Sequence, residues 1–151
     1  MAQMDRRTFM KLAGAGSVAA AVPIAGRLAS LDQDRLQFRA VAGMPKAPLP
    51  SYATHLVEGT IDLSSGTGIV TTRVLAGHPG GTSGVGLPGL ARIIRIDRVL
   101  AEPAGYRLSG VVEDRSQLQR GETAQVDIVV DRKNGVVHAP FSGRRVTLPL
   151  T

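Results

Sequence analysis

Three histidines are the side chains of this sequence best suited to metal binding or to acid–base chemistry near neutral pH. They are His55, His78 and His138, and the acids that follow His55 are Glu58 and Asp62. A metal site would need one of these carboxylates beside an imidazole. Residues three apart point to opposite faces of a strand, so His55 and Glu58 cannot share a local site. The spacing therefore argues against a local metal site. A site of His55 and His138 with Glu58 or Asp62 would have to be assembled across strands, and the sequence itself indicates no metal centre.

A glycine motif is the second candidate for chemistry. The segment Gly84-Val85-Gly86-Leu87-Pro88-Gly89 matches the G-x-G-x-x-G pattern of dinucleotide-binding turns. That pattern holds a pyrophosphate only when a strand precedes it and a helix follows it. Here a segment rich in Pro and Gly precedes it and a β-branched run follows it. We interpret residues 77–89 as a loop, a candidate lid or partner-binding segment, and predict no cofactor.

Other catalytic patterns are not found in the sequence. The chain has no Cys, which excludes thiolate chemistry, thiolate metal sites and disulfides. No Ser stands beside a His or in a G-x-S-x-G elbow. Carboxylates at alternating strand positions are typical of the solvated face of an antiparallel sheet. These carboxylates are Glu58, Asp62, Asp97, Glu113 and Asp127. The sequence thus leans against an enzyme without settling the question.

Two arginines are candidate residues of a ligand site. Arg92 and Arg98 share strand parity with Ile94 and Ile96, so both side chains are expected at the ends of one apolar row. The simpler interpretation has their stems along the core edge and their charged heads in water. If the row lines a barrel, either guanidinium would meet an anionic ligand at its mouth. The candidate ligand site under the glycine-rich loop then consists of His55, Arg92, Arg98, Tyr106 and His138.

The elements that must position these residues are strands. Apolar and polar residues alternate through most of the chain after residue 52, for example with Ile94, Ile96 and Leu100 on one face. We predict an all-β domain over residues 52–151, with about eight mostly antiparallel strands in a β-sandwich or, alternatively, a small closed β-barrel. Residues 31–51 are predicted to form an extended lead-in, because dense proline cannot join the middle of a sheet. Those prolines are Pro45, Pro48 and Pro50.

Composition defines the core and narrows the partners. With no Trp, three Phe and two Tyr, the core must be built from aliphatic side chains. The formal net charge is +6, but basic and acidic residues are interleaved rather than clustered. Nucleic-acid binding also favours stacking aromatic residues, which are scarce here. We therefore predict no nucleic-acid partner.

The first thirty residues have the layout of a bacterial export signal: a basic start, a short apolar run and small residues behind it. The basic start is Asp5-Arg6-Arg7-Thr8-Phe9-Met10-Lys11, and the apolar run is shorter than the roughly 20 residues of a membrane-spanning helix. At Arg6, Arg7, Phe9 and Lys11 the segment resembles a twin-arginine (Tat) signal. It departs from the common pattern at Asp5 and Met10.

This resemblance implies that the Tat translocase is a partner and that the protein folds before export. Its destination is then the periplasm, the cell envelope or the exterior. Ala19-Ala20-Ala21 fits the small-x-small rule for signal removal. Ile24-Ala25-Gly26 is a second candidate, in which Ile is tolerable rather than ideal at the first position. An uncleaved signal would remain as a tether, without a stable transmembrane span.

Two functions from different classes follow. The first is an exported non-catalytic β-domain, a binding, envelope-associated or structural module with a protein or envelope partner. The alternative is a small β-barrel that binds an apolar or anionic small molecule, with or without enzyme activity. A third idea, binding to an anionic polymer or membrane surface, predicts affinity that falls steeply with salt. A cavity with converging polar groups would favour the ligand-binding barrel, and a solid interior the module.

Overall fold

The computed structural model describes residues 34–44, 53–78 and 85–151. Every described strand belongs to one compact unit, residues 35–151. The predicted export signal, with Arg6, Arg7, Phe9 and Lys11, lies outside the described residues. So do the proline-rich residues 45–52 and residues 79–84 of the glycine-rich loop.

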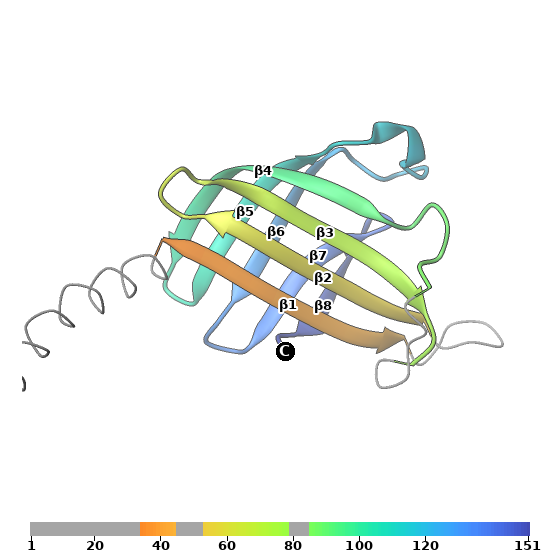
Figure 1. Cartoon of the computed structure of the whole chain (residues 1–151), viewed down its shortest axis with the longest axis horizontal. Helices are drawn as coiled ribbons and strands as arrows, with labels where there is room; N and C mark the ends of the chain where they lie inside the picture. Colours follow the sequence, from red (N-terminus) through yellow and green to blue (C-terminus); the bar gives the residue numbers. More distant parts are fainter. Residues whose placement is uncertain (1–33, 45–52, 79–84) are drawn as a thin grey trace, which may run out of the picture. The chain divides into compact units, whose positions relative to one another are not determined.

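Eight strands form one antiparallel sheet in which each strand pairs with the next along the chain (Figure 1). They are β1 (Arg35–Met44), β2 (Ala53–Asp62), β3 (Thr67–Ala76), β4 (Arg92–Glu102), β5 (Gly105–Val112), β6 (Gln125–Asp131), β7 (Val136–Phe141) and β8 (Arg144–Pro149). A short 3₁₀ helix, η1 (Arg115–Gln117), follows β5. The predicted all-β fold with about eight mostly antiparallel strands is confirmed.

The sheet curls until its first and last strands meet. Ala40 of β1 forms an isolated antiparallel bridge with Leu150. Beside it, the backbone N–H of Thr151 donates to the carbonyl of Arg39 at 2.9 Å. Of the two arrangements left open by the sequence, the single barrel-like sheet is therefore the one found.

The sheet begins earlier than the sequence pattern predicts. The predicted lead-in over residues 31–51 contains β1, which pairs with β2 along its whole length. The physical reason is an alternation of buried and exposed residues that the proline-rich segment after it conceals. Leu36 and Ala40 are buried, while Arg35 and Gln37, the two neighbours of Leu36, are exposed. All three prolines come after this strand ends. The boundary of the β-domain accordingly lies at Arg35 rather than at residue 52.

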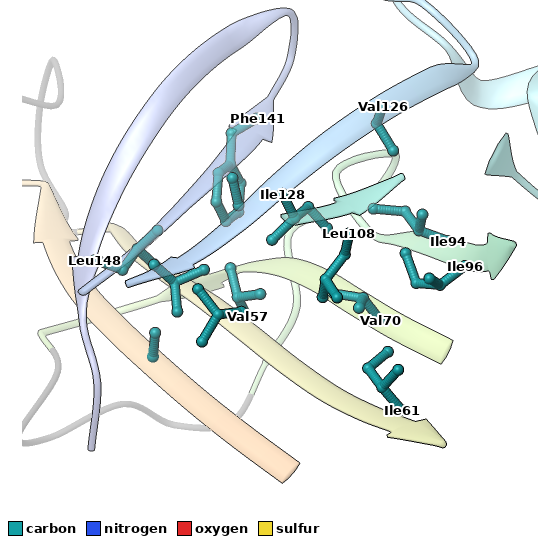
Figure 2. Packing of buried hydrophobic residues seen from close by; sticks show 14 of the residues in the cluster. Val57, Ile61, Val70, Ile94, Ile96, Leu108, Val126, Ile128, Phe141 and Leu148 are labelled. Atoms are coloured by element: carbon teal, nitrogen blue, oxygen red, sulfur yellow. The ribbon is translucent and has the colours of Figure 1, made fainter. Parts of the chain in front are cut away.

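Aliphatic side chains fill the middle of the space that the strands enclose (Figure 2). They come from alternate positions on each strand, as the two-residue period of a strand requires. The hydrophobic members that are less than 2% exposed are Ala40, Val57, Ile61, Val70, Ile94, Ile96, Leu108, Ile128, Val130, Val137, Ala139 and Leu148. A ligand site in this barrel therefore has to lie toward one of its ends.

A β-bulge in β4 changes which side chains face this core. The pairing with β5 advances by two residues of β4, from Ile96 to Arg98, against one residue of β5. Asp97 is the extra residue, so the alternation changes phase there. Val99 consequently packs against the core and Leu100 is 50% exposed. The prediction that Leu100 shares the inner face with Ile96 is wrong, because parity holds only along a regular ladder.

The two ends of the barrel differ in the length of their connections. At one end, tight turns at residues 63–66, 103–104 and 132–135 join β2 to β3, β4 to β5 and β6 to β7. At the opposite end, residues 77–91 join β3 to β4 and residues 113–124 join β5 to β6. The β7–β8 turn, Ser142-Gly143, also lies there. We call this opposite end the long-loop end.

The sheet opens toward the long-loop end at two places. The β6–β7 ladder covers only Val129–Asp131 against Val136–His138, next to their tight turn. At β1 and β8 a single isolated bridge is formed. The tip of the β7–β8 hairpin is thus held by its own ladder, which runs from Val136 opposite Pro149 to Phe141 opposite Arg144. This opening leaves room for a pocket.

Candidate functional site: the mouth pocket

A pocket of about 490 Å³ lies at the long-loop end. Its walls come from β2, β3, β7, β8 and both long connections, and its lining is mostly apolar, with no carboxylate. The lining residues are Ala53, His55, Val74, Leu87, Leu90, Gln119, Phe141, Ser142, Arg144 and Val146. We call this site the mouth pocket.

His55 is the most distinctive polar residue in the mouth pocket. It shares inward parity with Val57 on β2 and is 6% exposed. Its ring packs against that of Phe141, with centroids 4.2 Å apart and a 40° angle between the planes. The imidazole has no hydrogen bond to the described residues. Every fully buried side-chain N or O atom among these residues does have a hydrogen-bond partner, so the ring nitrogens of His55 are not fully buried. Its ring nitrogens are therefore accessible from the pocket.

Burial also sets the protonation state of His55. Desolvation disfavours the imidazolium and lowers the pKa of His55 below its ordinary value of 6.5. The ring is accordingly neutral at pH 7, with one nitrogen able to donate a hydrogen bond and the other able to accept one.

Arg92 forms a buried hydrogen-bond cluster next to the mouth pocket. Its Nε and Nη2 donate to the two carboxylate oxygens of Glu122 at 3.0 and 2.9 Å. Nη1 donates to the carbonyls of Gly89 and Ala91 at 2.7 and 2.8 Å, and Nη2 donates to that of Gln117 at 2.9 Å. A guanidinium has five N–H groups, so all of them are used. We call these five residues the Arg92 cluster.

The Arg92 cluster joins the two long connections and so shapes the rim of the pocket. Leu90 lies between two of its carbonyl acceptors, and the N–H of Gln119 donates to Oε2 of Glu122 at 2.9 Å. Both Leu90 and Gln119 line the mouth pocket. The hydrogen bonds from Arg92 hold the pKa of Glu122 below its ordinary value of 4.5 despite the opposing effect of burial.

The sequence-predicted ligand residues do not all come together. His55 and Arg92 lie at the long-loop end, but the N–H groups of Arg92 are bonded to the protein rather than lying in water at the core edge. Tyr106 lies at the tight-turn end, at the start of β5. His138 faces outward on β7, where its Nδ1 forms a 2.9 Å hydrogen bond with the hydroxyl of Thr147. Arg98 is exposed, since it follows the bulge.

The sequence reasoning missed several pocket residues. Phe141 had a usable signal, because it is one of few aromatic residues and directly precedes a Ser-Gly turn. Gln119, Leu87 and Leu90 lie in connections without a periodic pattern, so nothing in the sequence indicates their position. Arg144 has no apolar neighbour that marks it as part of a strand, because it follows the Ser-Gly turn and precedes the alternating residues Val146, Leu148 and Leu150.

The described part of the chain carries no metal cluster and no membrane-spanning helix. Over residues 34–44, 53–78 and 85–151, no three His, Asp or Glu side chains are grouped so that they could hold a metal ion. Within these same ranges, no helix has the length and apolar character needed to cross a membrane. No protein-family model matches this chain, and comparison with curated proteins and solved structures also gave no match.

Loss of the Arg92 guanidinium should destabilise the protein strongly. Arg92→Ala leaves the carboxylate of Glu122 buried without its partner, and we expect the free energy of unfolding to fall by about 3–5 kcal/mol. Urea denaturation measures this change. The matched control is Arg107→Ala, which removes an ion pair to Glu102 whose side chains are 42% and 33% exposed; its loss should cost at most about 1 kcal/mol. Equal effects of the two substitutions would contradict the role given to Arg92.

The buried His55 should make stability depend on pH in mildly acidic solution. Its pKa is lower in the folded than in the unfolded chain, so the unfolded state binds the proton more tightly. The free energy of unfolding should therefore fall as the pH drops from 6.5 toward the folded-state pKa. His55→Phe should flatten this part of the profile, as measured by urea denaturation at several pH values. An unchanged slope would show that His55 is not the group responsible.

Proposed function

We propose that this protein is an exported, non-catalytic binding module that takes a small, largely apolar molecule into the mouth pocket. The observation that carries the proposal is the pocket of about 490 Å³ at the open end of the barrel, with the neutral ring of His55 accessible from it. Export through the Tat translocase to the periplasm, the cell envelope or the exterior is supported by the residues at positions 6, 7, 9 and 11.

The size and place of the pocket support this function. Small-molecule sites commonly have volumes of about 300–1,000 Å³, are mostly apolar and occur in the mouths of β-barrels. Aliphatic side chains fill the middle of the barrel, and at its mouth Val74, Leu87, Leu90, Phe141 and Val146 offer apolar contacts to a ligand. The middle of the barrel, filled by aliphatic side chains, supports a binding or structural module. The pocket at the mouth supports the alternative, a small β-barrel that binds a small molecule.

The surroundings of His55 support binding rather than catalysis. A histidine that acts as a general base is usually oriented by a second polar group, as in nucleophilic triads. Within the described ranges, His55 has an aromatic neighbour, Phe141, and no carboxylate lines the pocket beside it. Ser142, the hydroxyl in the lining, belongs to the β7–β8 turn. A neutral imidazole in this setting is suited to one hydrogen bond with a ligand.

Filling the pocket should abolish binding of an apolar probe. We expect 1-octanol to shift the His55 ring signals in NMR spectra of the folded protein. Ala53→Phe places a ring in the pocket lining and should remove this response, whereas Ala101→Phe adds the same bulk at the exposed tight-turn end and should leave it intact. Absence of any shift in the wild-type chain, or an equal response in both variants, would overturn the proposed pocket.

Export should depend on the paired guanidinium groups of the signal. Lysine keeps the charge of arginine but not its planar array of donors, so Arg6→Lys with Arg7→Lys should retain the protein in the cytoplasm. The measurement is cell fractionation and immunoblotting in a bacterium with a Tat system. Arg27→Lys, outside the motif, is the control and should be exported normally. Unchanged export in a strain without the Tat translocase would contradict this part of the proposal.

A further inference from the structure

The mouth pocket has a positive charge at one side of its rim. Arg144 begins β8 and shares strand parity with Val146 and Leu148, so it belongs to the inner face at the long-loop end. It lies opposite Phe141 in the β7–β8 ladder and lines the pocket with it. Arg145, the next residue, has the opposite parity and does not line the pocket.

No acid of the described residues neutralises Arg144. The ion pairs among them join Arg39 and Arg73 to Glu58, Arg92 to Glu122, and Arg107 to Glu102. Glu122 is an acid next to the β7–β8 turn, because a Cβ on Gly143 would lie 3.2 Å from the carbonyl oxygen of Gly121 and 3.8 Å from the Cα of Glu122. Its carboxylate is already bound by two N–H groups of Arg92 and by the N–H of Gln119. Arg144 is therefore left with its charge toward the pocket rim.

The polar and apolar parts of the lining are separated in a way that suits an amphiphile. Arg144, Ser142 and Gln119 come from the β7–β8 hairpin and the β5–β6 connection, and their side chains supply hydrogen-bond donors. The inward residues Val74 and Phe141 are 7% exposed and continue into the aliphatic core. The neutral ring of His55 adds no charge of its own at pH 7.

We infer that the ligand of the mouth pocket is an amphiphile with an apolar body and a single carboxylate, and that Arg144 is the residue that selects the carboxylate. This inference rests on the proposed binding function. A guanidinium matches a carboxylate through two parallel N–H donors, which a neutral head group of the same length cannot exploit. The apolar body would lie against Phe141 and Val74, and the head group would remain at the solvent-facing rim.

The test compares two probes that differ in their head group, octanoate and 1-octanol, on the folded protein at pH 7. Binding is followed by NMR through the His55 ring signals, with the wild-type chain, Arg144→Gln and Arg145→Gln. We expect octanoate to bind the wild-type chain about fivefold more tightly than octanol does, in keeping with a partly exposed charge pair. Arg144→Gln should remove this preference without weakening octanol, and Arg145→Gln should preserve it.

Each other outcome identifies which claim fails. If octanol and octanoate bind the wild-type chain equally, the pocket binds apolar molecules but the carboxylate preference is wrong. If octanoate is preferred and Arg145→Gln reduces the preference as much as Arg144→Gln does, general surface charge is responsible and the role of Arg144 is wrong. If neither probe shifts the His55 signals, the proposed binding function itself fails.

Discussion

The mouth of this barrel depends on one buried ion pair, between Arg92 and Glu122. Burying two opposite charges is costly, and their attraction compensates only when the remaining hydrogen-bonding groups are also satisfied. Here both side chains are less than 10% exposed, and every N–H of the guanidinium has an acceptor. The acceptors come from two connections far apart in sequence. The pair therefore joins the two long connections directly, in addition to the backbone hydrogen bonds that each makes on its own.

The fold places the mouth pocket at one end of the barrel and not in its filled middle. Aliphatic side chains occupy the middle of the barrel, and the β6–β7 ladder and the β1–β8 contact are both short at the long-loop end. The tip of the β7–β8 hairpin can thus stand away from its neighbouring strands. Phe141 lies on this hairpin and points into the core (Figure 2). Its ring packs against that of His55. Core, hairpin and Arg92 cluster together define a pocket with an apolar interior and a polar rim.

Much of the fold follows from the alternation of apolar and polar residues, and the departures have local causes. Strand parity alone predicts the inner positions of Ile94 and Ile96. It does not predict the bulge at Asp97, and this bulge places Arg98 and Leu100 on the outside. β1 was obscured by prolines that begin only after it ends. The burial of Arg92 was not predictable, because its partner Glu122 is 30 residues away in a connection without periodicity. Pocket residues on loops are hidden for the same reason.

The central claim is that the Arg92–Glu122 pair holds both long connections in place and thereby forms the mouth pocket. Amide hydrogen exchange of Glu122→Gln against the wild-type chain tests it most directly, because it reports on each connection separately from the strands. The account predicts faster exchange in residues 85–91 and 113–124, with unchanged protection in the core strands β2, β5 and β6. Unchanged exchange in both connections, or a uniform increase across the whole barrel, would contradict it.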